Sequence, residues 1–391
     1  MKYSKAAESC YNFRMPAILL YLLGLLVIFY LLAKVCDQYF VKSLDIIAQK
    51  LQLSEDVAGA TFMAIGSSAP EFFTALFALT KVGAEDVGAG TIVGSAIFNI
   101  LVIVGASAVV ATAYLDWRPV VRDMGFYIIS ILALMFTFLD GRITMWEALS
   151  YLIAYAVYIV VLARWRYWFP GAKTEEQLGA IAEAFEKKEA EAEARTLIGK
   201  ILAPLDWLIA LPFPNLQKNP KLYVRAFAIS ILAIILLSYL LVELGIGLAH
   251  ALGIPEVIIA LTILAGGTSI PDLLSSVIVA KQGRGDMAVS NAVGSNTFDI
   301  LICLGLPWFV FILWRGEDII VATESLTSSV FLLFSTVVVM FLVLGIQKFK
   351  IGRYSGYFLL LLYAGYLSYA IYGAYHPEAM DIEVLRKAIG F

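Results

Sequence analysis

The chain has 391 residues, of which 61% are hydrophobic and 15% are charged, and its mean hydropathy is +0.85. Soluble domains contain about 45–50% apolar and about 25% charged residues, so this composition excludes an ordinary soluble protein and indicates several membrane spans. The net charge is −3, and the sequence has no basic stripe of the kind that binds nucleic acid.

Cysteine and histidine usage indicates neither a disulfide framework nor a transition-metal site. The three cysteines, Cys10, Cys36 and Cys303, are odd in number and widely spaced. The chain has only two histidines, His250 and His376. We therefore expect no cofactor and no enzyme activity, and nothing in the sequence predicts a protein partner.

Windows of about 20 apolar residues are long enough to cross a bilayer. The chain has ten of them, at 16–35, 57–80, 87–113, 119–139, 144–163, 224–249, 256–280, 287–313, 326–346 and 354–375. The first is interpreted as a retained span rather than a signal sequence, because it lacks an obvious small-residue cleavage site. The expected fold class is an all-α polytopic membrane protein.

Residues 164–223 form the only long connection between two windows. Its Ala-, Glu- and Lys-rich part, from Glu175 to Glu189, predicts a short solvated helix. The prolines that follow are expected to prevent a continuous helix in the rest of the connection. They are Pro204, Pro212, Pro214 and Pro220.

The distribution of Lys and Arg predicts the orientation. Placing the long connection in the cytosol puts 20 of these residues inside and 8 outside, and the stretch from Arg164 to Arg225 supplies ten of the 20. Both termini then lie outside the cell. We expect the membrane to be the plasma membrane. The predicted divisions are a first five-helix repeat at 1–163, a cytosolic loop at 164–223 and a second repeat at 224–391. Because five is odd, the ten transmembrane helices form two inverted five-helix repeats.

One motif occurs once in each half, at 57–105 and at 256–308. The first copy contains Ala64-Ile65-Gly66-Ser67-Ser68-Ala69-Pro70-Glu71 and Val93-Gly94-Ser95-Ala96-Ile97-Phe98-Asn99; the second contains Ala265-Gly266-Gly267-Thr268-Ser269-Ile270-Pro271-Asp272 and Val293-Gly294-Ser295-Asn296-Thr297-Phe298-Asp299. Glu71 and Asp272 are 201 positions apart, and Asn99 and Asp299 are 200 apart. A charge at the centre of a bilayer costs roughly 2.5–3.5 kcal/mol, so acids in matching apolar segments predict a transport site.

The motif places oxygen atoms four residues apart, a spacing that puts both on one face of a helix. The pairs are Ser67 with Glu71, Ser95 with Asn99, Thr268 with Asp272, and Ser295 with Asp299. Carboxylates, hydroxyls and amides without a soft ligand are the donors that Ca²⁺ and Na⁺ prefer. The alternative for the hydroxyls is a hydrogen bond back to a carbonyl of their own helix.

Prolines predict that two of the helices break inside the membrane. Pro70 and Pro271 cannot donate to the carbonyls of Gly66 and Gly267, and we expect these glycines to help break the helix. Other small residues in the motif are interpreted as close helix packing. Freed carbonyls find no partner in lipid, so a bound cation is expected to satisfy them. The windows that hold the motif contain no Lys or Arg to pair with the acids.

Both copies resemble the alpha-repeats of Na⁺/Ca²⁺ exchangers. The resemblance is carried by Ser67–Glu71 with Gly90–Asn99 in the first copy and by Gly267–Ala280 in the second. The continuation through Gly285–Ser290, Val293–Asn296, Phe298–Ile300 and Gly305–Trp308 most resembles the K⁺-dependent branch. This resemblance implies ten helices, outside termini and a large cytosolic loop, although the loop shows no calcium-sensor domain.

The resemblance also implies roles for single residues. Glu71 and Asp272 correspond to the central Ca²⁺ carboxylates, and Asp299 is the residue linked to K⁺ transport. The residues implied to line the Na⁺ and Ca²⁺ sites are Ser67, Ser95, Asn99, Thr268 and Ser295, with Asn296 and Ser275 beside Asp299. Ser275 stands where animal members commonly have threonine, a departure that keeps the hydroxyl.

Charge balance also favours K⁺. Glu71, Asp272 and Asp299 carry three negative charges when ionised, and Ca²⁺ together with K⁺ carries three positive charges. A site with Asn at position 299 would need only Ca²⁺. The sequence therefore predicts that K⁺ accompanies Ca²⁺.

We expect a secondary antiporter that exchanges Na⁺ for Ca²⁺ by alternating access, with the first and sixth helices sliding past a nearly fixed ion site. The alternatives are a K⁺-independent Na⁺/Ca²⁺ exchanger, a H⁺/Ca²⁺ exchanger, a cation channel and an intramembrane aspartyl protease. The last rests on Gly283-Arg284-Gly285-Asp286, which fits a Gly-x-Gly-Asp pattern but falls at a predicted cytosolic turn.

Overall fold

The computed structural model describes residues 2–50, 64–81, 85–168, 197–214, 219–281, 283, 285–321 and 323–375. The helix expected from Glu175 to Glu189 lies outside the described residues, as do residues 57–63 of the second window.

Helices make up most of the described chain. The elements up to the long connection are α1 (Lys2–Val35), η1 (Cys36–Val41), α2 (Lys42–Lys50), α4 (Ala64–Ser67), α5 (Ala69–Ala78), α6 (Glu85–Phe98), η3 (Asn99–Ile103), α7 (Val104–Val110), β1 (Ala113–Tyr114), α8 (Trp117–Thr137), β2 (Arg142–Ile143) and α9 (Met145–Trp168). Those that follow are α11 (Leu197–Ala210), η5 (Pro220–Leu222), α12 (Tyr223–Leu252), α13 (Glu256–Ile259), η6 (Ala260–Leu264), α14 (Ala265–Thr268), α15 (Ile270–Lys281), α16 (Gly285–Phe298), η7 (Asp299–Leu304), α17 (Gly305–Arg315), β3 (Ile319–Ile320), α18 (Thr323–Ile346), β4 (Lys350–Ile351) and α19 (Arg353–Tyr375). Elements η1, η3, η6 and η7 are π-helical, and η5 is a 3₁₀ turn.

Seven helices in the described chain are long and apolar enough to cross a membrane. They are Pro16–Leu44, Asp86–Val110, Trp117–Thr137, Met145–Trp165, Tyr223–Leu252, Ala288–Arg315 and Leu326–Ile346, and they match seven of the ten predicted windows. Interruptions divide the windows 57–80 and 256–280, and α19 has seven tyrosines that lower its hydropathy. The count of ten spans therefore stays a prediction.

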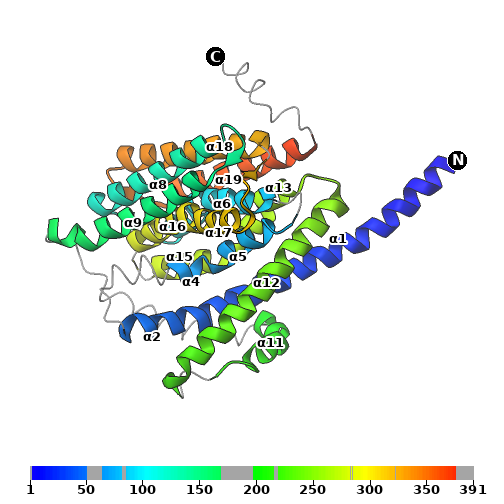
Figure 1. The fold of residues 1–391 in the computed structure, drawn as a ribbon, viewed down its shortest axis with the longest axis horizontal. Helices are drawn as coiled ribbons and strands as arrows, with labels where there is room; N and C mark the ends of the chain where they lie inside the picture. Colours follow the sequence, from blue (N-terminus) through cyan, green and yellow to red (C-terminus); the bar gives the residue numbers. More distant parts are fainter. Residues whose placement is uncertain are drawn as a thin grey trace, which may run out of the picture.

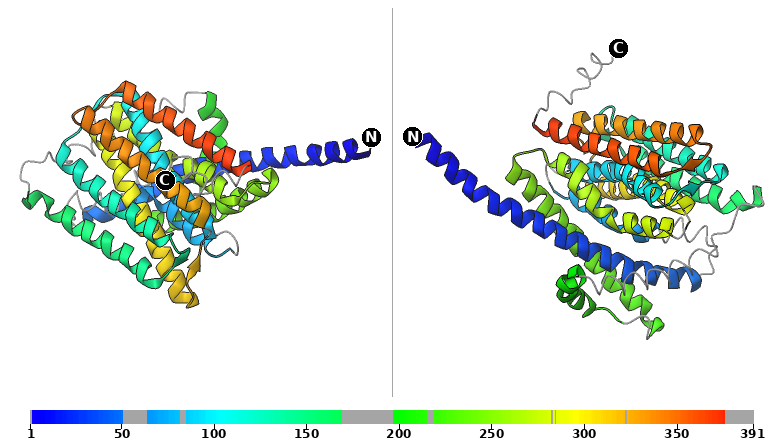
Figure 2. Two further views of the ribbon diagram at one scale, coloured as in Figure 1. Left: turned by 90° about the horizontal axis from the view of Figure 1, so that it is seen from above. Right: turned by 180° about the vertical axis from the view of Figure 1, so that it is seen from behind.

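The helices form a bundle with one pair set apart. In Figure 1, α1 and α12 run together along one side, whereas α8 and α18 lie on the opposite side, with α6, α16 and α17 between them. Figure 2 shows the same separation from behind. Helix α1 packs along α12, and α12 in turn packs against α5. The acid-bearing helices thus have the α1–α12 pair on one side and the rest of the bundle on the other.

The order of elements from α4 to α9 recurs from α14 to α19. Both stretches run through a short helix, a second helix, a third that continues into a π-helical turn, and then a helix, a strand, a long helix, a strand and a last long helix. The strands pair antiparallel between the two stretches, with Ala113 opposite Ile351 and Arg142 opposite Ile320. Strand β1 therefore lies beside β4, and β2 lies beside β3.

The predicted helix breaks are confirmed, one at each copy of the motif. Ser68 separates α4 from α5 with φ −94° and ψ 10°, and Ser269 separates α14 from α15 with φ −83° and ψ 4°. Pro70 and Pro271 each stand at the second position of the helix that follows, where the missing N–H removes no helical hydrogen bond.

The predicted role of the glycines was wrong. Gly66 and Gly267 lie inside the helical turns of α4 and α14, before the breaks. A Cβ at Gly267 would come within 2.0 Å of the Phe29 ring of α1, and one at Gly66 within 2.8 Å of a methyl group of Val41. These glycines therefore allow the first helix to approach the motif closely, while the prolines and serines make the break.

The expectation that prolines would prevent a helix in the long connection was also wrong at one position. Pro204 lies within α11, which runs from Leu197 to Ala210. The helix lies against α1 and ends at Ala210, before Pro212.

Candidate functional site

Two buried acids begin the helices that follow the breaks. Glu71 lies in the first turn of α5 and Asp272 in the first turn of α15, and their exposed fractions are 2% and 4%. The N-terminus of a helix carries a partial positive charge and unpaired N–H groups, which favour a carboxylate at this position. The breaks thus place both carboxyl groups inside the protein.

Asp299 and Asn99 mark a second pair of matching positions. Asn99 begins the π-helical turn η3, Asp299 begins η7, and both side chains are buried. A π-helical turn adds one residue to the helical turn and changes the direction in which side chains point, and such turns are frequent at functional sites. Sequence reasoning found the two residues but missed the π-helical turns, which have no composition signal.

Hydroxyl groups join the two copies of the motif through equivalent contacts. Ser68 Oγ lies 3.3 Å from Ser295 Oγ, and Ser95 Oγ lies 2.5 Å from Ser269 Oγ. Each pair takes one serine from a helix break and the other from the third helix of the opposite copy. Ser68 and Ser269 were missed by sequence reasoning, although each directly follows a predicted ligand, Ser67 or Thr268.

The acids also contact hydroxyls from the opposite copy. Thr268 lies within hydrogen-bonding reach of Glu71, and Ser67 lies within reach of Asp272. The prediction that Ser67 shares a helical face with Glu71, and Thr268 with Asp272, was wrong. The breaks at Ser68 and Ser269 divide each of these two pairs between two helices. Thr268 also donates to the Leu264 carbonyl at 3.1 Å, the alternative expected for a helical hydroxyl.

Ser295 brings the second copy's two acids together. Its hydroxyl lies 3.0 Å from Asp272 Oδ2 and 3.5 Å from Asp299 Oδ2, so the predicted pairing of Ser295 with Asp299 is found in the structure. The Cys303 thiol, another group that sequence reasoning missed, lies 3.7 Å from Asp299 Oδ1 and 3.6 Å from the Ser68 carbonyl. Asp299 is therefore held between its own helix and the broken helix of the first copy.

Asn99 and Asn296 connect the centres of the two copies. Asn99 Nδ2 donates to Asn296 Oδ1 at 2.8 Å, and Asn296 Nδ2 donates to the Ala96 carbonyl at 3.1 Å. Ser275 lies one turn after Asp272 in α15, and its side chain lies outside the part that the structure describes. Of the ten predicted site residues, the other nine lie at the breaks, on α6 and α16, or at the first residue of a π-helical turn.

Two buried oxygens of this site have no hydrogen-bond partner among the described residues: Glu71 Oε2 and Asn99 Oδ1. Ion pairs in the described part of the chain involve Asp123, Asp206, Glu243 and Glu256 rather than Glu71. A buried carboxylate oxygen without a partner is costly, and a cation is one group that satisfies it.

A cation at this site would find several kinds of oxygen donor: carboxylates, hydroxyls and amides. Among the described residues, no group of three or more His, Cys, Asp and Glu side chains is placed to hold a metal ion. Hydroxyl and amide oxygens would have to complete the coordination, and such hard oxygen donors suit Ca²⁺, Na⁺ and K⁺ rather than a soft metal. A donor set of this kind suits ions that are transported rather than a metal ion that stays bound.

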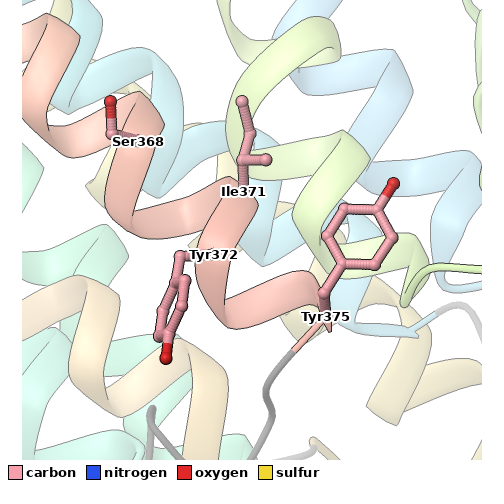
Figure 3. Close-up of a pocket in the computed structure, with 4 residues that line it drawn as sticks. All are labelled: Ser368, Ile371, Tyr372 and Tyr375. Atoms are coloured by element: carbon pink, nitrogen blue, oxygen red, sulfur yellow. The ribbon is translucent and has the colours of Figure 1, made fainter.

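A surface groove lies elsewhere in the described chain. It has a volume of about 570 Å³ and is lined by Ser368, Ile371, Tyr372 and Tyr375, all on α19 (Figure 3). None of these residues belongs to an element that carries a buried acid of the motif, and the groove is open to the outside of the bundle. We do not assign the ion site to it.

The fold and the site define a helical membrane protein with buried carboxylates, hydroxyls and amides gathered at two helix breaks. The chain belongs to the sodium/calcium exchanger family, because the family described as "Sodium/calcium exchanger protein" matches residues 21–164 and 222–372.

Curated relatives confirm the resemblance to the K⁺-dependent branch. Human sodium/potassium/calcium exchanger 4 is 29% identical over 91% of this chain and 81% of its own length. Human sodium/potassium/calcium exchanger 5 is 31% identical over 89% of this chain and 82% of its own length.

Solved structures share the fold. The H⁺/Ca²⁺ exchanger CAX matches with a TM-score of 0.63 and 15% identity, over 99% of this chain and 98% of the other. The sodium-calcium exchanger NCX_Mj matches with a TM-score of 0.52 and 22% identity, over 90% of this chain and 99% of the other.

Proposed function

We propose that this protein exchanges Na⁺ for Ca²⁺ across a membrane and carries K⁺ together with Ca²⁺. The observation that carries the proposal is the position of Glu71 and Asp272, which are buried at two helix breaks and contacted by hydroxyls from the opposite copy of the motif. The names of two curated relatives, both sodium/potassium/calcium exchangers, support the same choice of ions.

The three acids have two different roles in this proposal. Glu71 and Asp272 are the Ca²⁺ carboxylates, and Na⁺ competes for them, so the two kinds of ion occupy the site in turn. Asp299 supplies the third negative charge, which K⁺ balances when Ca²⁺ is bound. The remaining predicted ligands are Ser67, Ser95, Asn99, Thr268, Ser275, Ser295 and Asn296.

The proposed architecture is ten transmembrane helices in two inverted five-helix repeats, at 1–163 and 224–391. The recurring order of elements and the matched strand pairs, β1 with β4 and β2 with β3, support it. The broken helices at 57–80 and 256–280 and the tyrosine-rich α19 supply the three spans beyond the seven continuous apolar ones.

The arrangement of the helices supports alternating access. The pair α1 and α12 lies along one side of the acid-bearing helices (Figure 1). We propose that this pair slides, which exposes the site first to one side of the membrane and then to the other. The proposed orientation places the termini outside a plasma membrane and residues 164–223 in the cytosol, with no protein partner required.

The test is Ca²⁺ uptake into Na⁺-loaded proteoliposomes, with either K⁺ or choline as the other external cation. We expect uptake that requires both internal Na⁺ and external K⁺. Equal uptake in choline would leave a K⁺-independent Na⁺/Ca²⁺ exchanger. Uptake driven by a pH gradient without Na⁺ would replace the proposal with a H⁺/Ca²⁺ exchanger.

A further inference from the structure

Helix α11 in the long connection is almost entirely apolar. Between Leu202 and Pro212, Asp206 is the only charged residue. The Tyr30 hydroxyl of α1 donates to Asp206 Oδ1 at 2.5 Å, and Lys34 Nζ lies 3.4 Å from the same oxygen. The charged side of α11 is therefore turned toward α1 and neutralised there.

The opposite side of α11 exposes large apolar side chains. Trp207, Leu208 and Leu211 have exposed fractions of 67%, 57% and 59%. The neighbouring exposed residues on this part of the chain, Ala203, Pro204, Ala210 and Pro212, are also apolar. Lys200, in the first turn of α11, is the other charged residue of this helix, and from Ala203 to Pro212 this side carries no charge. A contiguous apolar surface is unfavourable in water, so this part of the helix needs an apolar cover.

The contacts of α11 show the level at which this face lies. Tyr30 and Lys34 contact Asp206. The ring of Tyr39 stacks on that of Phe213, with 3.8 Å between the ring centroids. Tyr30, Lys34 and Tyr39 all belong to the apolar span Pro16–Leu44. The face therefore lies beside a segment that crosses the membrane. Helix α12 also exposes large apolar side chains, among them Leu232 and Leu236.

Helix α11 is too short to cross the membrane itself. Its 14 residues span roughly 21 Å, less than the hydrocarbon core of about 30 Å. In Figure 1 the axis of α11 points nearly along the line of sight, whereas α1 runs across the view. The right panel of Figure 2 shows the same arrangement from behind. The helix thus crosses α1 steeply, which is the orientation of a helix that lies in the plane of a membrane.

We propose that α11 is an interfacial helix whose outer face, formed by Trp207, Leu208 and Leu211, inserts among the acyl chains of the bilayer. Asp206 fixes the helix to α1 through Tyr30 and Lys34. Apolar side chains on one face of a helix in the interface plane are the arrangement by which amphipathic helices bind lipid. The end of the long connection is then a membrane-bound arm, not a solvated loop.

The test measures the depth of a nitroxide attached to Leu208→Cys in the full chain, reconstituted in liposomes, with Cys10 replaced by serine. The side chains of the other two cysteines, Cys36 and Cys303, are buried. Collision rates with oxygen, which prefers lipid, and with a water-soluble nickel chelate are compared. Leu236→Cys on α12 gives the lipid-facing reference, and Lys221→Cys, exposed just before α12, gives the water-facing reference.

We expect the label at 208 to favour oxygen over nickel by several-fold relative to position 221 and to resemble position 236. A ratio equal to that at 221 would place α11 in water and overturn the proposal. Low collision rates with both reagents, together with broadening between fully labelled copies, would show a second copy of the chain on this face and would also overturn it. Leu211→Cys, on the same face, replaces Leu208→Cys if that variant does not reconstitute.

Discussion

The helices that carry the predicted ion ligands and the pair α1–α12 differ in what surrounds them. The most apolar stretch of the Asp86–Val110 span is 83% buried inside the protein and that of Ala288–Arg315 is 61% buried, against 28% for Pro16–Leu44 and 33% for Tyr223–Leu252. Hydrogen bonds between side chains join the ligand-bearing segments to one another, for example Ser95 to Ser269. The α1–α12 pair instead meets them through apolar side chains such as Phe29, Ile234 and Leu264.

This difference separates a fixed region from one that can move. Directional hydrogen bonds among buried groups hold one geometry, because breaking one leaves a costly unpaired atom. An apolar contact can shift by one turn and remain an apolar contact. An ion pair between Lys81 and Glu243 links the end of α5 to α12 at the rim of the bundle, where its side chains are partly exposed and the pair contributes little.

The largest expected effect concerns the fixed region. Glu71→Gln and Asp272→Asn should each reduce Na⁺-driven Ca²⁺ uptake to background, because each removes one of the two carboxylates at the helix breaks. Uptake is measured in proteoliposomes that contain equal amounts of folded protein. Glu147→Gln, at the start of α9 and outside the site, serves as the control and should keep transport. Normal uptake in either site variant would refute the assignment of the ion site.

An intermediate effect is expected at Asp299, which separates the two ions. Asp299→Asn should keep Ca²⁺ exchange but make its rate equal in K⁺ and in choline, because the third negative charge is gone while Ser295 still links positions 272 and 299. The measurement is the ratio of initial uptake rates in the two media. K⁺ dependence that survives this change would show that charge balance at Asp299 is not the basis of K⁺ coupling.

The smallest effect is expected where the two regions touch. In Gly267→Ala the added methyl group would meet the Phe29 ring, and overpacking of this kind costs about 1–3 kcal/mol. We expect a lower thermal transition of the purified protein and slower exchange, with partial recovery in the double variant that also carries Phe29→Leu. Gly294→Ala on α16 is the matched control, since a Cβ there meets nothing within 4 Å. Equal losses in the two glycine variants would contradict the close approach of α1.

The sequence was sufficient for features that depend on local chemistry. Apolar windows predicted the seven continuous spans, and Pro70 and Pro271 predicted where two helices break. The offset of 201 positions between Glu71 and Asp272 identified the acids as a matched pair. Each of these features follows from residue type and from spacing along the chain.

Features that depend on tertiary structure could not be predicted in this way. The contacts of Ser67 with Asp272 and of Thr268 with Glu71 join residues about 200 positions apart, and helical spacing cannot reveal them. The π-helical turns at Asn99 and Asp299 insert a residue without any change in composition. Pro204 shows the same limit, because it lies inside α11 although proline disfavours the interior of a helix.

The exchange of partners between the two copies has a consequence for how the protein is made. Ser68 and Ser95 leave the ribosome roughly 200 residues before Ser295 and Ser269, and strand β1 is made long before β4. Until the second half is inserted, the first half carries buried hydroxyls and an open strand edge that only the missing half can satisfy. Neither half can make these contacts alone, so assembly of the proposed ion site must be a late event that begins only after synthesis has passed residue 295.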